Sequence, residues 1–463
     1  MPATLFDKIW SQHVVAELGG GVSLLAIDRH LLHDLEAGPG FTRLAKRGLA
    51  VRNPELTFAT PDHSIATDPG RHTDSNTNGG RLLREMRRGA FAVGVKLFDL
   101  GGEDQGILHV IGLTLPGLTI VCPDSHTCTH GGLGALAFGI GATEVSHVLA
   151  TQTLRQVKPK RMRIDYEGAV PPGVTAKDII LATIGQIGTG AGRGHAVEYA
   201  GSAIRTLTID ERLTICNLSI ELGSKIGMIA PDETTYRYLR GRRYAPEGAL
   251  LERALRHWET LESDADAAFD CEHRINVAEI APQITWGTSP QDVIAVTARI
   301  PNPAHEPDPP RRRSMEAALN YMGLTPGNPI EGTPIDWVFI GSCTNGRLSD
   351  LRDAARFVAG RKVAPSVRAW VVPGSEATRH EAEREGLDKI FKTAGFEWRA
   401  PGCSMCLGAN GDIVGPGERS VSTTNRNFVG RQGPNARTHL ASPVMAAAAA
   451  VAGRIADARK FGA

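Results

Sequence analysis

Short apolar runs separated by glycine-containing turns dominate the first third of the chain. Runs of this kind, bounded by turn residues, are typical of buried strands, whereas apolar positions at three- and four-residue spacing are typical of helices. We predict strands at residues 23–27, 91–97, 107–111 and 118–122, and helices at residues 80–88 and 142–156. Their alternation predicts an α/β/α domain over residues 1–157, with a largely buried sheet.

The same alternation continues over residues 158–300, which we predict to be a second α/β/α domain. Strands are predicted at residues 161–166 and 205–209, and Thr175 is placed to cap a helix between them. In the stretch 214–223, Asn217 and Glu221 would share one face of a helix. Such a pair usually lies on a solvated surface, but its neighbours here are apolar, so we expect both side chains to be buried and functional.

A third domain, predicted over residues 301–463, begins with the proline-rich stretch P-N-P-A-H-E-P-D-P-P-R-R-R at residues 301–313. Because proline lacks an N–H and fixes its backbone, we interpret this stretch as a linker that holds neither helix nor strand, with solvated arginines. Beyond it we predict strands at residues 337–340, 396–399 and 419–423, and helices at residues 347–359 and 442–460. The first of these helices has one apolar face, and the loop before it is placed to cap its N-terminus.

Composition and charge narrow the class of protein. A chain of 463 residues is too long for one ordinary core, which supports several domains. Lysine plus arginine number 51 against 50 acidic residues, so the net charge of +1 gives no electrostatic reason for general nucleic-acid or membrane binding. Residues 1–10 lack a basic region followed by an apolar one, and the apolar stretch 444–452 is too short to span a bilayer. We therefore expect a cytoplasmic protein.

Three cysteines lie in two short motifs rich in glycine and small residues. Cys343 lies in G-S-C-T-N at residues 341–345, and Cys403 and Cys406 lie in P-G-C-S-M-C-L-G at residues 401–408. An odd total of seven cysteines favours metal or thiol chemistry in a reducing compartment over disulfides. The C-x-x-C pair by itself fits a redox dithiol, half a zinc site or an iron–sulfur site. A closed zinc site needs a fourth ligand, whereas an iron–sulfur cluster held by three thiolates leaves one iron open to a substrate.

Polar side chains cluster around the ends of the predicted strands. These residues are Asp62 and His63 in T-P-D-H-S, His109 in Q-G-I-L-H-V, and Asp124, Ser125 and His126 after the strand that ends at residue 122. A single histidine is more often a satisfied polar group near a core, but several acids and histidines at loop starts suit a dehydration, which needs an acid for the leaving hydroxyl. The glycine-rich runs 131–141 and 185–194 match neither nucleotide-binding pattern, and we interpret both as turns and close backbone packing.

Another polar group follows the predicted strand at residues 419–423. Asn425, Arg426 and Arg431 lie there in N-R-N-F-V-G-R. Two arginines in a glycine-containing loop are often surface charges. Arginine also binds carboxylates bidentately, so the alternative is that these two arginines bind the carboxylates of a dicarboxylate substrate.

Taken in order, these motifs resemble the aconitase superfamily. The likeness runs from I-D-R-H-L-L-H at residues 27–33, through G-S-C-T-N and the C-x-x-C pair, to S-T-T-N-R-N-F at residues 422–428 and A-S-P-V-M-A-A-A-A-A at residues 441–450. It implies three α/β/α domains of the aconitase large-subunit kind around a central cleft with one 4Fe-4S cluster. The implied cluster ligands are Cys343, Cys403 and Cys406, and the iron left open would bind a hydroxyl and a carboxylate of the substrate.

The resemblance also implies roles for the other polar residues. Asp62 and His63 match the pair that protonates the departing hydroxyl. The remaining implied pairs are Asp124 with His109 and Glu221 with His126. Further substrate-binding positions match Ser125, Asn217, Asn425, Arg426 and Arg431, with His33 where aconitases carry glutamine.

Two features bear on the substrate. His33 points away from citrate, and the superfamily motif is altered here by Pro123 and Cys128. We interpret Cys128 as a small buried residue, with altered specificity as the alternative. The superfamily's general base is a serine on a fourth, swivelling domain that has no counterpart here. The resemblance therefore implies a separate small subunit that supplies it.

The expected activity is that of the isopropylmalate-isomerising branch, which moves a hydroxyl by dehydration and rehydration of a substituted malate in leucine biosynthesis. A sister hydro-lyase acting on citraconate and 2-methylmalate, on homoaconitate or on another malate derivative is the closest alternative. An RNA-binding regulator and a structural zinc protein are more remote, because the charge is neutral and every matching catalytic residue is present.

Overall fold

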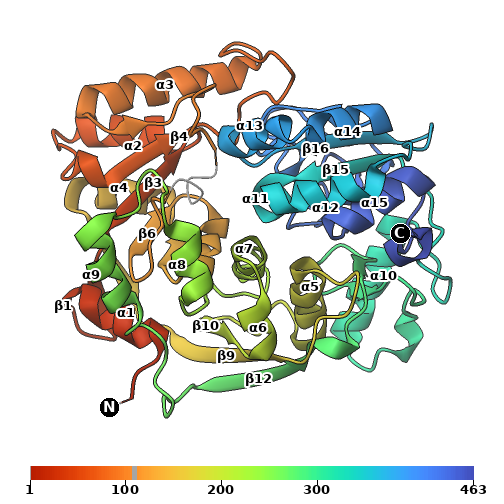
Figure 1. The fold of residues 1–463 in the computed structure, drawn as a ribbon, viewed down its shortest axis with the longest axis horizontal. Helices are drawn as coiled ribbons and strands as arrows, with labels where there is room; N and C mark the ends of the chain where they lie inside the picture. Colours follow the sequence, from red (N-terminus) through yellow and green to blue (C-terminus); the bar gives the residue numbers. More distant parts are fainter. Residues whose placement is uncertain (1, 107–111, 463) are drawn as a thin grey trace. The chain divides into compact units, whose positions relative to one another are not determined.

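The computed structural model describes residues 2–106 and 112–462 (Figure 1). The strand predicted at residues 107–111 and the predicted site residue His109 lie outside these ranges. The chain divides into two compact units, each built from three segments. Unit 1 comprises Met1–Ile65, His72–Ala169 and Gly190–Asn276, and unit 2 comprises Ala66–Arg71, Val170–Thr189 and Val277–Ala463. The fold is mixed α/β with parallel sheets, as predicted.

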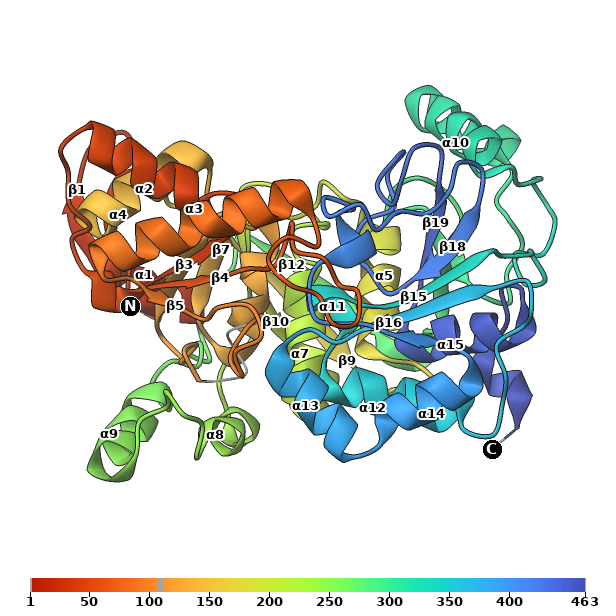
Figure 2. The same cartoon turned by 90° about the horizontal axis from the view of Figure 1, so that it is seen from above.

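Unit 1 contains a five-stranded parallel sheet in the order β5-β4-β3-β6-β7. Its strands are β3 (Arg29–His33), β4 (Thr57–Thr60), β5 (Lys96–Leu97), β6 (Thr119–Cys122) and β7 (Leu136–Gly139). Both faces are buried, since Leu32 and Val121 pack in one apolar cluster and their neighbours Leu31 and Ile120 in another. Figure 2 shows helices on one side of this sheet, namely α2 (Ala37–Lys46), α3 (Thr77–Val93) and α4 (Ala142–Thr151).

A second parallel sheet in unit 1 has the order β11-β10-β9-β12. Its strands are β9 (Lys160–Glu167), β10 (His195–Ala200), β11 (Ile226–Met228) and β12 (Cys271–Asn276). A small antiparallel sheet joins β1 (Val14–Glu17), β2 (Val22–Ala26) and β8 (Thr153–Val157). The other helices of the unit are α1 (Leu5–His13), α6 (Ser202–Thr206), α7 (Ile209–Asn217), α8 (Glu233–Leu239) and α9 (Gly248–Trp258).

Unit 2 contains a five-stranded parallel sheet in the order β17-β16-β15-β18-β19. Its strands are β15 (Trp337–Gly341), β16 (Arg368–Val372), β17 (Glu397–Trp398), β18 (Arg419–Ser422) and β19 (Arg437–Leu440). Helices α12 (Leu348–Val358), α14 (Leu387–Ala394) and α15 (Pro443–Ala452) contribute to one apolar core with β15 and β16 (Figure 2). The unit also contains α5 (Ala176–Ile187), α10 (Pro309–Met322), α11 (Ser342–Asn345), α13 (Glu376–Arg384) and the antiparallel pair β13 (Gln283–Thr285) and β14 (Val293–Ala295).

Several predicted elements of unit 1 were wrong. The strand predicted at residues 205–209 is instead the end of α6 and the start of α7, because Thr208 and Glu211 form a reciprocal cap at the N-terminus of α7. The helix predicted to reach residue 156 stops at Thr151, because Gln152 adopts a left-handed conformation and β8 then pairs with β2. The strand predicted at residues 91–97 is shorter, since α3 continues to Val93.

Two elements of unit 2 also differ from prediction. The stretch 301–313 is not a linker throughout, because α10 begins at Pro309 behind the cap Asp308. Proline is tolerated there because the first turn of a helix needs no donated N–H. Helix α15 ends at Ala452 instead of residue 460, since Gly453 takes a left-handed conformation. The predicted capping of α5 by Thr175 is confirmed.

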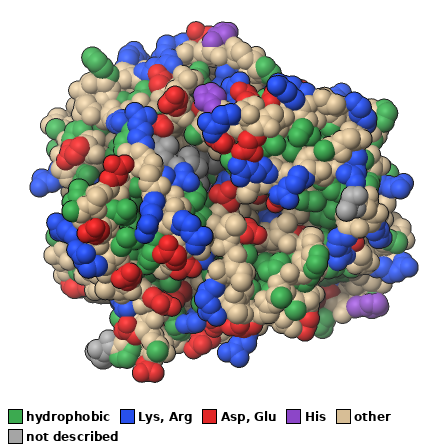
Figure 3. Space-filling model, in the orientation of Figure 1, with side chains coloured by type: hydrophobic (Ala, Val, Ile, Leu, Met, Phe, Trp, Pro, Cys, Tyr) green, Lys and Arg blue, Asp and Glu red, His purple; other side chains and the backbone are tan. Residues whose placement is uncertain are grey.

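The surface carries charges of both signs. On the face drawn in Figure 3, basic and acidic side chains are interspersed over the surface. Among the described residues, no helix has the length and apolarity needed to cross a membrane.

Candidate active site

In unit 1, the ends of three neighbouring strands bring His33, His63 and Asp124 together. His33 ends β3, His63 follows β4 and Asp124 follows β6. The rings of His33 and His63 have centroids 4.1 Å apart. His63 lies between two carboxylates, with Nδ1 3.3 Å from Asp62 Oδ2 and Nε2 3.5 Å from Asp124 Oδ2. A histidine in contact with two acids is well suited to hold and release a proton.

The protonation of this group is set by burial and by its neighbours. Burial raises the pKa of the Asp124 carboxyl. Its hydrogen bond to His126 and the charge of the nearby His63 lower the pKa by a larger amount, so it lies far below the usual range. Burial lowers the pKa of His33 to about 4. His33 is therefore neutral near pH 7. Its Nε2 donates to the carbonyl of Pro123 at 3.1 Å, which fixes the tautomer.

Asp34 is a residue of this region that the sequence analysis missed. Its carboxylate accepts the main-chain N–H groups of three consecutive residues, Asp62 (2.8 Å), His63 (2.8 Å) and Ser64 (2.7 Å). Asp34 is fully buried, so it holds the turn that presents Asp62 and His63. The available signal was its place one residue beyond the motif that ends at His33.

A second pair in unit 1 joins His126 to Glu221. Asp124 caps a 3₁₀ helix, Ser125–Leu133, and accepts the N–H of His126 at 2.7 Å. Ser125 Oγ lies 3.2 Å from His126 Nδ1, and His126 Nε2 donates to Glu221 Oε1 at 3.2 Å. Contacts at both ring nitrogens therefore fix the orientation of the His126 imidazole.

The helix expected to carry both Asn217 and Glu221 ends earlier. Helix α7 stops at Asn217, and Glu221 lies in the turns that follow, because Leu218 already departs from helical geometry. Asn217 is fully buried, as predicted, and its amide donates to Thr129 Oγ1 at 2.7 Å. Cys128 is fully buried too, with Sγ 3.5 Å from the carbonyl of Asn217, and burial raises the pKa of its thiol to about 12. Cys128 is thus a small buried residue.

The glycine-rich runs are sites of close backbone approach, as predicted. A Cβ on Gly131 would lie 1.7 Å from the carbonyl oxygen of Gly227, and one on Gly139 would lie 2.6 Å from that of Asp124. A Cβ on Gly192, in the other run, would lie 2.9 Å from the main-chain nitrogen of Ser224. These glycines let the 3₁₀ helix and its neighbours pack closely.

In unit 2, the two cysteine motifs converge on the side chain of Asn425. Cys343 lies in α11 directly after β15, and Cys403 and Cys406 border a single 3₁₀ turn. The amide nitrogen of Asn425 donates to Cys343 Sγ at 3.6 Å, and its oxygen accepts from Cys406 Sγ at 3.6 Å. None of the seven cysteines, all of which lie in the described ranges, forms a disulfide. Cys343 and Cys406, 63 positions apart in the sequence, therefore lie against one carboxamide.

The main chain around these thiols is strained. Ser342 and Ser404, next to Cys343 and Cys403, have φ angles of 78° and 47°, which residues with a side chain rarely adopt. Such strain is typical of functional sites. Arg347, which is buried, donates to the carbonyls of Thr344 (2.6 Å) and Cys343 (2.7 Å) and so supports the turn; the sequence analysis did not single it out.

The two arginines predicted to bind substrate lie in the loop that follows β18. Arg431 donates from Nη2 to Cys406 Sγ at 3.9 Å, and its guanidinium lies 5.5 Å from the centroid of the Phe428 ring. Arg426 directly follows Asn425. The arginine-bearing loop and the thiols therefore belong to one local group within unit 2.

Lys177, another residue that was not predicted from the sequence, belongs to the same local group. It is 1% exposed, and its Nζ donates to the carbonyls of Thr423 (2.9 Å) and Thr424 (2.6 Å). Burial lowers its pKa to about 7, although Cys406, Asp350 and Cys343 act in the opposite direction. In the sequence, Lys177 was part of a helix start and carried no further signal.

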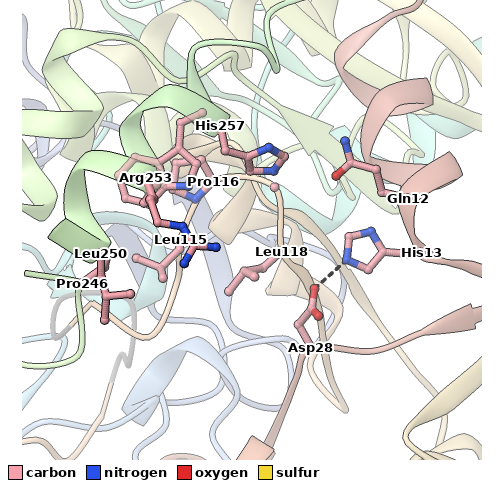
Figure 4. A pocket seen from close by; sticks show the side chains of 13 residues that line it. Gln12, His13, Asp28, Leu115, Pro116, Leu118, Pro246, Leu250, Arg253 and His257 are labelled. Carbon is pink, nitrogen blue, oxygen red and sulfur yellow. Dashed lines mark hydrogen bonds and ion pairs between the residues drawn. The ribbon is translucent and has the colours of Figure 1, made fainter.

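A pocket of about 500 Å³ in unit 1 shares no lining residue with the predicted site (Figure 4). Its polar wall includes the ion pair of His13 and Asp28, 2.7 Å apart. Leu115, Leu118 and Leu250 give it apolar walls. It marks a separate feature of the unit.

Comparison with known proteins places this geometry in context. Residues 7–453 match the aconitase family (aconitate hydratase). A protein from Bradyrhizobium diazoefficiens, named 3-isopropylmalate dehydratase large subunit 1, is 63% identical over 460 residues, which span 98% of this chain and 96% of that protein. The crystal structure of aconitase X from Thermococcus kodakaraensis aligns with a TM-score of 0.48 at 10% identity, over 87% of this chain and 84% of that one.

Proposed function

Because the chain belongs to the aconitase family, we propose that it is the large catalytic subunit of a hydro-lyase that interconverts 2-isopropylmalate and 3-isopropylmalate in leucine biosynthesis. The observation that carries this proposal is the 63% identity to a 3-isopropylmalate dehydratase large subunit over almost the full length of both chains. The reaction removes a hydroxyl and a proton from neighbouring carbons as water, and returns them with their positions exchanged. No electrons are gained or lost overall.

The family implies a 4Fe-4S cluster, and the thiols of unit 2 fit it. Iron–sulfur clusters are held by cysteine thiolates, and Cys343 and Cys406 lie on either side of one carboxamide, with Cys403 on the same 3₁₀ turn as Cys406. We infer that these three residues hold the cluster and leave one iron without a protein ligand. When bound, the cluster supplies a Lewis acid for the substrate's hydroxyl and carboxylate.

The residues of unit 1 supply the proton chemistry in this proposal. The hydroxyl leaves as water only if it gains a proton, and His63, held between Asp62 and Asp124, is placed to hold that proton. Glu221 keeps His126 oriented as a second acid–base group, with Ser125 at its other nitrogen.

The substrate's two carboxylates require cationic partners. Arg426 and Arg431 provide guanidinium groups, which bind carboxylates through paired hydrogen bonds. His33 is neutral near pH 7, so it offers no charge to a third carboxylate. Asn217 adds a buried amide. Two guanidinium groups match the two carboxylates of a substituted malate.

A small subunit completes the enzyme in this proposal, since the related protein is named as a large subunit. The resemblance assigns to that partner the swivelling domain with the serine that removes the carbon-bound proton. We therefore expect the large subunit alone to bind the cluster without turning over substrate.

The test is anaerobic purification of the chain with and without its candidate small subunit, followed by iron and sulfide counts. Addition of 2-isopropylmalate should raise the ultraviolet absorbance of the alkene intermediate only when both subunits are present. Cys403→Ser should abolish both cluster and turnover. Cys271→Ser should change neither, because Cys271 lies on β12 outside the predicted site. A full cluster that acts on 2-methylmalate or homoaconitate instead would assign a sister reaction, and one zinc without sulfide would overturn the proposal.

A further inference from the structure

Lys177 is buried in unit 2 with no role in the chemistry described above. Lysine is almost never fully buried unless its ammonium is paired, because moving a charge out of water is costly. Here it is 1% exposed, and two of its three N–H donors are used by the carbonyls of Thr423 and Thr424. A lysine ammonium that is buried in this way needs an interaction partner or a functional role.

The two carbonyls lie directly before Asn425, the residue on which the cysteine motifs converge. Thr423 is also tied to the end of β15, where its Oγ1 accepts the N–H of Gly341 at 2.9 Å and donates to the carbonyl of the same residue at 3.0 Å. Asn425 in turn donates to Thr344 Oγ1 at 3.0 Å. Lys177 thus holds the main chain that carries Asn425 against the turn that carries Cys343.

The ammonium interacts electrostatically with two thiols of the site and with two acids, and each of them favours its charged form. These groups are Cys406, Asp350, Cys343 and Asp178. Both acids have other partners: Asp350 accepts from Asn345 Nδ2 at 3.0 Å, and Asp178 accepts the N–H of Gln283 at 2.7 Å. The two thiols become anionic when they bind metal, and a buried cation nearby then offsets their charge.

We propose that Lys177 is a positioning residue of the cluster site: its Nζ fixes the main chain that carries Asn425, and its buried ammonium acts electrostatically on the thiolates of Cys343 and Cys406. This inference rests on the proposed function, because it requires the cluster to be bound by these thiols. A nearby positive charge favours the more negative, reduced form of a cluster and so raises its reduction potential.

The experiment compares Lys177→Met, Lys177→Gln and Lys177→Arg in the full chain purified anaerobically. Three quantities are measured: iron and sulfide content, the reduction potential of the cluster by EPR-monitored titration, and the rate at which visible absorbance is lost in air. Arg212→Met is the matched control. Arg212 is as buried as Lys177 and is paired with Asp232 at 2.8 and 2.6 Å, but it lies in unit 1.

Lys177→Met should lose its cluster about tenfold faster than the native chain, because two buried carbonyls lose their donor. Its reduction potential should fall. Lys177→Gln should show the same fall in potential, and it serves as the neutral variant if Lys177→Met does not fold. Lys177→Arg should restore the potential, because the charge returns. Arg212→Met should lower thermal stability and leave the potential and the rate of loss unchanged.

A native potential and a native rate of loss in the neutral variants would overturn the inference. An equal fall in potential in Arg212→Met would overturn it too, because the effect would then be general. If the native chain itself held no iron and sulfide, the proposed function would fail instead, so the two failures can be told apart.

Discussion

Asn425 donates from its amide nitrogen to the sulfur of Cys343 at 3.6 Å, across 82 positions of sequence. The oxygen of the same carboxamide accepts from Cys406, so a single neutral side chain lies against two thiols. Asn425→Asp would place a carboxylate between two sulfurs that bind metal as thiolates, and like charges would repel. We expect the variant to hold several-fold less iron and sulfide. Asn427→Asp is the control, since Asn427 is equally buried but donates to the carbonyl of Gly287.

Glu221→Gln should lower kcat by about a hundred- to a thousandfold, because the His126 imidazole loses its anionic partner. The steady-state rate with the reconstituted enzyme measures this. Asp28→Asn is the matched control: it removes the carboxylate partner of His13, 2.7 Å away, in the pocket outside the predicted site. An unchanged kcat in Glu221→Gln, or an equal loss in the control, would contradict the assigned role.

Asp34→Asn should destabilise unit 1 by about 3 kcal/mol near pH 7, since a carboxylate that accepts three buried N–H groups is replaced by an amide that cannot. Burial raises the pKa of Asp34, but the charges of His63 and His33 and the N–H groups of Asp62 and His63 lower it by more, so its folded pKa is below the usual 3.8. Its contribution is therefore present above about pH 4 and is lost as the pH falls through the folded pKa. Urea unfolding at pH 7 and at pH 3 should show the variant's deficit shrinking at the lower pH.

His30 should make the fold sensitive to mild acid. Neither of its ring nitrogens has a hydrogen-bond partner among the described residues, and burial lowers its pKa to about 3. The unfolded chain takes up a proton near the ordinary pKa of 6.5 while the folded chain does not, so stability falls as the pH drops below about 6.5. His30→Met should recover about 2 kcal/mol of this loss at pH 5 relative to pH 7.

The pH dependence of denaturant unfolding, followed from pH 7 to pH 5, measures the effect. His305→Met is the control, because His305 is exposed. Equal slopes for the native chain and His30→Met would show that another group takes up the proton.

Gly131→Ala should lower the free energy of unfolding by about 3 kcal/mol or more, because its Cβ would meet the carbonyl oxygen of Gly227 at 1.7 Å and backbone would have to move. Gly190→Ala should be close to neutral, since its Cβ would have nothing within 4 Å. The thermal midpoints of the two variants, measured side by side, decide the matter. Similar midpoints would mean that the 3₁₀ helix shifts at little cost.

The sequence predicted best where a local signal was strong. The apolar run before Cys343 correctly predicted β15, and the apolar spacing after it correctly predicted α12. Neither of these local signals depends on distant residues. Prediction failed at residues 205–209, where the Thr208 cap outweighs strand propensity, and at Pro309, where the first turn of a helix accepts a proline. Local pattern is overridden in both cases by the chemistry of a helix start.

The candidate site divides in the same way. Cysteines, acids and arginines at loop starts could be recognised by type and motif, and their assigned roles remain predictions. Asp34 and Lys177 could not, because what distinguishes them is the set of N–H groups and carbonyls that they meet, up to 247 positions away for Lys177. Only the folded chain gives a charged residue of this kind its partners.

Unit 2 is assembled from segments that are synthesised at very different times during translation. Thr67 and Lys177 emerge early, yet Thr67 accepts a hydrogen bond from Arg399, 332 positions later, and Lys177 must wait for Thr423 and Thr424. The thiol site therefore cannot form until synthesis has passed Arg431. A chain whose translation stops before Thr423 would contain Lys177 without the two carbonyls that it binds.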